Sequence, residues 1–174
     1  VNISEGFDFL GWNFRKYGDK LLVKPSKKNV RNFLTEIRKV IEGNKMVTQE
    51  NLIRLLNPKI RGWTEYHRNQ VSKDTFSNVD KAIWEKLWQW AKRRHPTKSA
   101  QWVKNSYWPY RNGKDWKFGT EVLDKKGNKV WLDLVKASST PIRRHTKVRA
   151  QANPYDPQWE TYFEERFQRH FEQE

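Results

Sequence analysis

The sequence contains no cysteine, so the chain can form no disulfide and no metal site built on thiolates. It has no apolar run of 18 residues and no charged segment followed by an apolar leader. We therefore expect neither a membrane span nor a signal peptide. The absence of cysteine is compatible with a reducing compartment but does not establish one.

The common nucleotide-binding and catalytic motifs are also absent. There is no GxxxxGK[ST] loop, no GxGxxG loop, and no shielded pair of acidic residues for acid–base chemistry. The four histidines are scattered and form no HxxxH pair, so we expect no metal site and no catalytic residue in this chain. We expect an interior or groove position for His67, a helix end for His95, and surface positions for His145 and His170.

Positive charge dominates the composition. The chain has 35 Lys and Arg against 20 Asp and Glu, a formal net charge of +15. Residues 1–113 carry most of the excess, residues 136–149 hold five basic residues and no acid, and residues 150–174 are acidic. A surplus of this size favours a polyanionic partner, with nucleic acid ahead of an anionic membrane.

The first half of the chain predicts two or three strands followed by helices. FDFLGW (7–12) alternates like a strand buried on at least one face, which suggests either a distant partner strand or a chain that begins inside a larger fold. A hairpin is expected at Gly18–Asp19. Ser26 and Thr48 are expected N-caps of two helices, and Asn57–Pro58 is expected to end the second and begin a third.

The second half predicts one long helix, a short helix, a hairpin and a final helix. The long helix spans FSNVDKAIWEKLWQWAKRR, and its apolar stripe is Phe76, Val79, Ile83, Leu87, Trp90 and Ala91. A short helix is expected at about 98–106 and a β-hairpin with its turn near Gly127–Asn128. Aromatic residues at helical spacing after Pro157 predict the last helix. Trp63, Trp90 and Trp102 are expected in the core, whereas Trp84 and Trp88 could be core edge or an exposed stacking platform.

Several groups of cations have both a structural and a functional interpretation. Arg61 and Arg68, with Glu65 between them, could form a surface ion-pair lattice or straddle phosphates. Residues 92–94 could simply complement a helix dipole. Contact with a nucleic-acid backbone is the better interpretation of the basic residues that have no acidic neighbours, which are Arg143, Arg144, Lys147 and Arg149.

Several spaced motifs resemble group II intron reverse transcriptases. FDFLGWNFRKY followed by KLLVKPSKKNV resembles the end of the palm in that family. LNPKIRGWTEYHR, and then DKAIWEKLWQWAKRRHPTKS with WVKNSYW, resemble the maturase or thumb domain. The likeness covers about residues 5–108, and PIRRHTKVRAQANPYDPQWETYFEERF resembles the segment leading to the DNA-binding and HNH nuclease regions.

The resemblance implies a mainly α fold, α+β overall: a helical thumb or maturase bundle with a short N-terminal β element and a C-terminal hairpin plus helix. It implies three parts: 1–25 as the end of the palm, 26–108 as the maturase domain, and 109–174 as the region leading toward a DNA-binding or HNH segment. The YADD-type aspartates and the HNH cysteines and histidines of the family do not occur here. DNA synthesis or cleavage by this chain alone is therefore not implied.

The function implied by the resemblance is binding of structured group II intron RNA and assistance to its splicing. Mg²⁺ would be held by the intron RNA and by a polymerase palm, not by this chain. The alternatives are one half of a split polymerase that grips the template–primer duplex with a finger–palm partner, and a module that targets DNA. An intracellular location is implied, in the cytoplasm or nucleoid of a bacterium or in an organelle. The RNA-binding residues implied are Lys24, Lys27, Lys28, Arg31, Arg61, Arg68, Lys92, Arg93, Arg94 and Lys98, with the 143–149 segment extending the contact to RNA or DNA.

Overall fold

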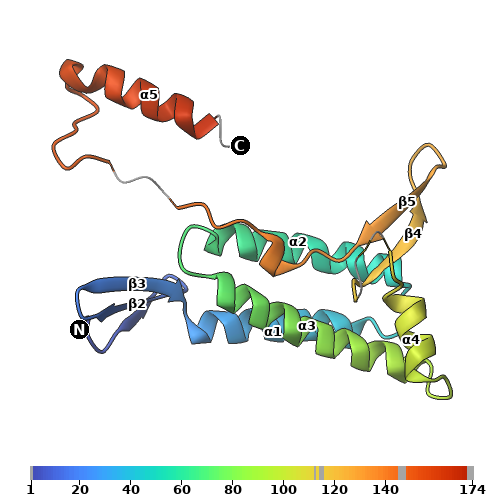
Figure 1. Cartoon of the computed structure of the whole chain (residues 1–174). Helices are drawn as coiled ribbons and strands as arrows, with labels where there is room; N and C mark the ends of the chain where they lie inside the picture. Colours follow the sequence, from blue (N-terminus) through green and yellow to red (C-terminus); the bar gives the residue numbers. More distant parts are fainter. Residues whose placement is uncertain (1, 112, 114–115, 145–147, 172–174) are drawn as a thin grey trace. The chain divides into compact units, whose positions relative to one another are not determined.

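The computed structural model describes residues 2–111, 113, 116–144 and 148–171, and it confirms the mainly helical α+β fold (Figure 1). The chain divides into two compact units, residues 1–144 and residues 145–174. The first unit holds an N-terminal sheet, four helices and a β-hairpin. The second holds a short 3₁₀ turn and the last helix, and we describe each unit by itself.

The N-terminal sheet has three antiparallel strands in the order β1 (Phe7–Phe9), β2 (Trp12–Tyr17) and β3 (Lys20–Pro25). The predicted hairpin at Gly18–Asp19 is confirmed, because Tyr17 pairs with Lys20 across that turn. The partner of the first strand is thus the next strand in sequence.

The expected burial of FDFLGW is wrong. Phe9 is 59% exposed and Leu10 is 69% exposed. Leu10 and Gly11 both have positive φ, 47° and 81°, and make the tight turn between β1 and β2. The apolar run therefore contains a turn as well as an edge strand, which the alternation of apolar residues did not reveal.

Four helices follow: α1 (Lys27–Gly43), α2 (Gln49–His67), α3 (Lys73–Arg94) and α4 (Ala100–Tyr107). Both predicted N-caps are confirmed, since the hydroxyl of Ser26 accepts from Asn29 N at 3.1 Å and that of Thr48 accepts from Asn51 N at 3.3 Å. Short connections make α2 antiparallel to α1 and α3. The sheet lies where α1 begins, and α4 follows the end of α3 (Figure 1).

The expected break at Asn57–Pro58 is wrong, because α2 continues through Pro58. Leu56 and Ile60, on either side of it, are fully buried in the core, while Pro58 itself is exposed. Burial of the apolar face outweighs the hydrogen bond that proline cannot donate to the preceding turn. Asn57 has a separate role that is described below.

The core of the first unit lies between α1, α2 and α3, and it extends to α4 and the hairpin. The predicted stripe of α3 is confirmed in full, because all six of its residues are buried. Trp108 and Phe118 continue this core beyond α4, and their ring centroids are 5.1 Å apart. The first unit's segment after Trp108 is thus packed on the helices.

The hairpin consists of β4 (Gly119–Leu123) and β5 (Lys129–Asp133), and its predicted turn near Gly127–Asn128 is confirmed. It packs on α2. After β5 the chain forms a 3₁₀ turn, η1 (Ala137–Ser139), against α3. There the carboxylate of Asp80 accepts from Ala137 N at 2.6 Å and Ser138 N at 2.9 Å.

The second unit contains the 3₁₀ turn η2 (Pro157–Trp159) and helix α5 (Glu160–Phe171). The helical spacing of its aromatic residues is confirmed. Trp159 packs edge-on against Tyr162, and Tyr162 against Phe163. None of the helices in the described ranges combines the length and apolar character needed to cross a bilayer.

Candidate nucleic-acid interface

The first turns of α1 carry exposed cations at the end of the helix where a dipole favours anions. Lys27, Lys28 and Arg31 are exposed, and the first turn has no acidic residue. The last turn has no basic residue. Because the positive end of the dipole repels cations, this arrangement opposes helix stability and leaves these charges available to an anion. Lys24, at the end of β3, is exposed just before them.

A polar bridge holds the start of α1 beside the end of α2. The side-chain oxygen of Asn29 accepts from Trp63 Nε1 at 2.8 Å and lies 3.0 Å from His67 Nε2. Because this oxygen is an acceptor, His67 Nε2 carries the proton. Trp12 of β2 packs edge-on against His67 with centroids 4.4 Å apart, so the bridge also fixes the sheet.

His67 is a buried neutral histidine, as its sequence position predicted. Burial lowers its pKa from 6.5 to about 4 because the charged ring would lose its hydration. Its Nδ1 has no hydrogen-bond partner among the described residues. A proton on this ring would therefore destabilise the junction of sheet, α1 and α2.

The later part of α2 adds cations beside the same junction. Arg61 is exposed, whereas Arg68 pairs with Glu65 at 2.9 Å, as the ion-pair interpretation expected. Arg143 N donates to Arg68 O at 3.0 Å, which brings the 143–144 segment to this end of the bundle. We call the following residues the sheet-end cations: Lys24, Lys27, Lys28, Arg31, Arg61, Arg68, Arg143 and Arg144.

The remaining predicted cations of the first unit lie at the other end, where α3 stops. Lys92 and Arg93 are exposed, and Lys98 lies over the ring of Trp102 at 5.5 Å. Arg94 also has a structural role: it donates to Lys45 O at 2.9 Å and to Val47 O at 2.6 Å, and so fixes the connection between α1 and α2. We call Lys92, Arg93 and Lys98 the α3-end cations.

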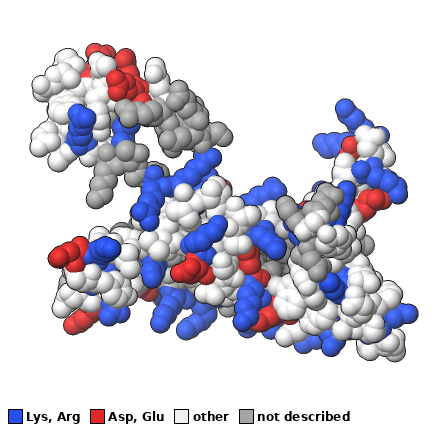
Figure 2. Space-filling view, viewed as in Figure 1, with Lys and Arg blue, Asp and Glu red and all other residues white. Residues whose placement is uncertain are grey.

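The predicted cations of the first unit therefore fall into two separate basic regions. The 22 residues of α3 place them about 33 Å apart. Lys and Arg outnumber acidic residues on the face shown in Figure 2. Of the other predicted backbone contacts, Arg149 belongs to the second unit and lies over Tyr162 at 5.1 Å, and Lys147 lies outside the described residues.

Trp84 and Trp88 occupy the edge of the core. Their rings stack 5.6 Å apart, and Trp88 lies 5.4 Å from Trp108. Trp84 and Trp108 also line a cavity of about 40 Å³ between α3 and the segments 116–118 and 134–136 on either side of the hairpin. The expected burial of Trp102 is wrong: it is 39% exposed, because Val103 and Tyr107 take the inward positions of α4.

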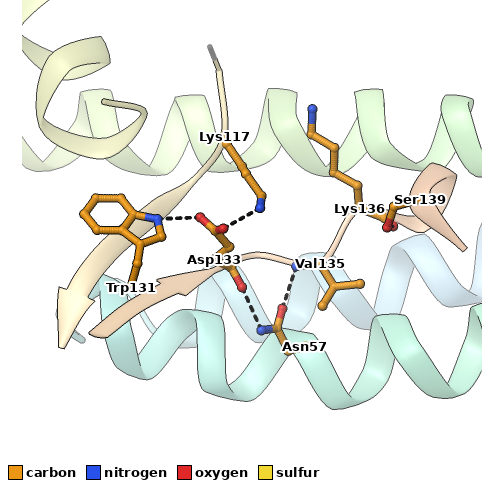
Figure 3. Close-up of polar contacts among 7 residues, drawn as sticks. All are labelled: Asn57, Lys117, Trp131, Asp133, Val135, Lys136 and Ser139. Atoms are coloured by element: carbon orange, nitrogen blue, oxygen red, sulfur yellow. Dashed lines mark hydrogen bonds and ion pairs between the residues drawn. The ribbon is translucent and has the colours of Figure 1, made fainter. Parts of the chain in front are cut away.

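Two amide side chains of α2 hold the hairpin, which sequence reasoning missed. Asn57 Nδ2 donates to Asp133 O at 2.9 Å, and Asn57 Oδ1 accepts from Val135 N at 2.9 Å (Figure 3). Gln49 Nε2 donates to Tyr107 O at 2.9 Å and Gly119 O at 3.1 Å. One sequence signal could have indicated this attachment: Gln49 and Asn57 lie eight residues apart on the apolar face of α2, where a polar side chain needs a hydrogen-bond partner.

The carboxylate of Asp133 completes this attachment. It accepts from Trp131 Nε1 at 2.6 Å and pairs with Lys117 (Figure 3). Gly119 lies so close that an added Cβ would be 2.5 Å from Asp133 Oδ1. Within the described ranges, no group of three His, Asp or Glu residues could hold a metal ion.

The structure is thus a basic, mainly helical protein with exposed cations at both ends of its bundle. Residues 30–108 match the family model of the group II intron maturase-specific domain. The resemblance to a maturase domain inferred from the sequence is therefore confirmed over residues 30–108.

Curated relatives come from two Euglena species. The chain is 30% identical over 117 residues to the ribosomal operon-associated A protein of Euglena longa, covering 67% of this chain and 22% of that protein. It is 34% identical over 70 residues to maturase-like protein 1 of Euglena longa, covering 38% of this chain and 15% of that protein. The match to the Euglena gracilis maturase-like protein 1 is 31% over 71 residues, covering 39% and 15%. The chain spans about a fifth or less of the length of these relatives.

Proposed function

We propose that this chain binds structured group II intron RNA through its sheet-end and α3-end cations and so assists splicing. The maturase-specific domain implies intron RNA as the partner. The RNA would hold the catalytic Mg²⁺ ions and carry out the transesterifications. The protein would stabilise the RNA fold by contacting backbone and shape, which is how proteins bind A-form RNA.

The observation that carries this proposal is the inverted charge of α1. Lys27, Lys28 and Arg31 stand where the helix dipole disfavours them, and within the described ranges none of them forms an ion pair. A bound polyanion offsets the repulsion between these cations and the helix dipole, because its phosphates attract both the cations and the N-terminus of the helix. Cations fixed about 33 Å away on α3 would contact a second part of the same RNA.

Removing the three α1 charges should weaken RNA binding without weakening the fold. We expect Lys27→Gln/Lys28→Gln/Arg31→Gln to lower affinity for intron RNA about 10- to 100-fold near physiological salt and to reduce the salt slope by roughly 3. Its free energy of unfolding should stay equal or rise slightly, because the dipole repulsion is removed. Filter binding across a salt series and urea unfolding would measure the two effects.

A variant with the same change in charge at another place is the control. Lys125→Gln/Lys126→Gln/Lys129→Gln removes two exposed cations from the β4–β5 turn and a third, which pairs with Glu121, from the start of β5. If both triple variants lose the same affinity, the binding is generic attraction to net charge. A length-matched unstructured RNA is the second control. The wild type should bind intron RNA more tightly than this RNA, and the preference should persist as the salt concentration rises.

The alternative functions place the main contact elsewhere. The same resemblance suggests target DNA, or a finger–palm portion of a reverse transcriptase, as a further partner. In the DNA-targeting alternative the basic segment at 143–149 and the following helix dominate binding. A truncation after residue 144 is suited to this test, because residues 145–174 form a separate compact unit.

We expect deletion of residues 145–174 to leave affinity for intron RNA within about threefold of the full chain, since the sheet-end and α3-end cations remain. Electrophoretic mobility shift with intron RNA and with duplex DNA would measure this. Loss of most RNA affinity on deletion would favour the DNA-targeting alternative. A cut at residue 136 would be a poor test, because it removes η1 from Asp80.

A further inference from the structure

Trp102 exposes an aromatic surface inside an acid-free basic region. From Lys86 to Arg111 the sequence has seven Lys and Arg and no Asp or Glu. Trp102 lies in the first turn of α4, and its neighbour Val103 points into the core. Its indole is 39% exposed and has the ammonium of Lys98 over its ring.

The connection between α3 and α4 positions this indole. The ring of His95 meets the indole edge-on with centroids 4.7 Å apart, and His95 Nε2 lies 2.8 Å from the hydroxyl of the buried Tyr107. Trp102 is thus in contact with a residue that is anchored to the core. The ammonium of Lys98 lies 5.5 Å from the ring centroid and is carried on an exposed, flexible side chain.

We propose that Trp102 stacks on one unpaired nucleobase of the bound RNA while Lys98 contacts an adjacent phosphate. This inference rests on the proposed RNA binding and names one site within it. Every base presents a π-face to an indole, so the contact needs no particular sequence. In the free protein Lys98 occupies the ring face by a cation–π contact, which a base and a phosphate together replace.

The surroundings favour a nucleic-acid strand over a protein aromatic group. The exposed Lys92 and Arg93 lie at the end of α3, immediately before His95. A strand that places a base on Trp102 carries phosphates past these cations. An aromatic side chain of a protein partner would bring no such compensating charge.

The test separates base from phosphate. A single-stranded oligoadenylate RNA and the same oligomer with abasic sites have the same charge and differ in their bases. We expect the wild-type chain to bind the adenine oligomer more tightly, and Trp102→Leu to lower that affinity about 5- to 150-fold. The same variant should leave the abasic affinity and the salt slope unchanged.

Lys98→Gln should give the opposite signature. It should lower affinity for both oligomers and reduce the salt slope by about 0.7, because it removes one phosphate contact on a single strand. Tyr17→Leu is the matched control: Tyr17 is 51% exposed and lies under Arg15 at 5.0 Å, the same arrangement at the opposite end of the unit. This control should leave both affinities unchanged.

Two results would overturn the proposal: Trp102→Leu changes the adenine affinity less than twofold, or it lowers both affinities equally. An equal effect of Tyr17→Leu would also overturn it, because any exposed aromatic residue would then suffice. Unchanged circular dichroism and urea midpoint establish that each variant folds. The oligomer comparison tests only the stacking site and does not depend on selectivity for intron RNA. Failure of the proposed function would instead appear as a loss of preference for intron RNA over unstructured RNA.

Discussion

Replacement of Asn57 by aspartate is expected to lower the free energy of unfolding by about 2–4 kcal/mol, although the two side chains have the same shape. Aspartate can still accept from Val135 N, but it cannot donate to Asp133 O and instead faces that carbonyl with a second acceptor. Asn57 is only 7% exposed, so water does not restore the lost hydrogen bond. Urea unfolding at neutral pH would measure the change.

The matched control for this prediction is Gln101→Glu. Gln101 donates to Asn105 on the exposed surface of α4, where water can replace either partner. This amide-to-acid change should cost less than about 0.5 kcal/mol. If Asn57→Asp is equally mild, the amide clamp does not hold the hairpin. Proteolysis within 109–136 should increase in parallel with the loss of stability.

The second large effect is a loss of stability on mild acidification that depends on His67. Its pKa is about 4 in the folded protein and 6.5 when unfolded, so between these values the unfolded chain binds more protons. Stability therefore rises with pH through this window and falls as the pH is lowered from 6.5 toward 4. Between pH 7 and pH 5 the expected loss from this group is about 2 kcal/mol.

Two histidine variants isolate this effect. His67→Gln can still donate to Asn29 but does not titrate, so its stability should change less between pH 7 and pH 5 than that of the wild type. His95→Gln should retain the full dependence on pH. An identical pH profile for the wild type and His67→Gln would contradict the assignment. Thermal unfolding at a series of pH values would supply the comparison.

Features decided by neighbours in sequence were predictable. Ser26 and Thr48 were recognised as caps because each side chain bonds to a backbone N–H three residues later. The stripe of α3 was predicted residue by residue because helical period alone decides which side chains share a face. Fold class followed from these local patterns and from the resemblance to a known family.

Features decided by distant segments were not predictable. Asn57–Pro58 looked like a helix break because proline cannot donate the backbone hydrogen bond of a helix. The role of Asn57 within α2 was hidden because its partners lie at residues 133–135. Arg94 could not be separated from Lys92 and Arg93, because its role depends on the backbone of the α1–α2 connection.

The same holds for charge and exposure along a helix. Sequence identified the basic residues of α1 and α3, but only the antiparallel course of α2 shows that they lie at opposite ends of the bundle. Trp102 lies only one position away from a core position of α4, because its neighbour Val103 is buried and Trp102 is not. The placement of α4 against the bundle decides which of the two faces inward.

The clamp at Asn57 also imposes an order on folding during synthesis. The amide oxygen of Asn57 meets its partner 78 residues later in the chain, so α2 exists for a time with a polar group aimed at an unfilled site. At roughly 5–20 residues per second, that interval lasts about 4–16 seconds. For most of it, the apolar surface that Phe118 and Ala137 later cover is open to water. The nascent helices are therefore most exposed to wrong contacts just before the hairpin is made.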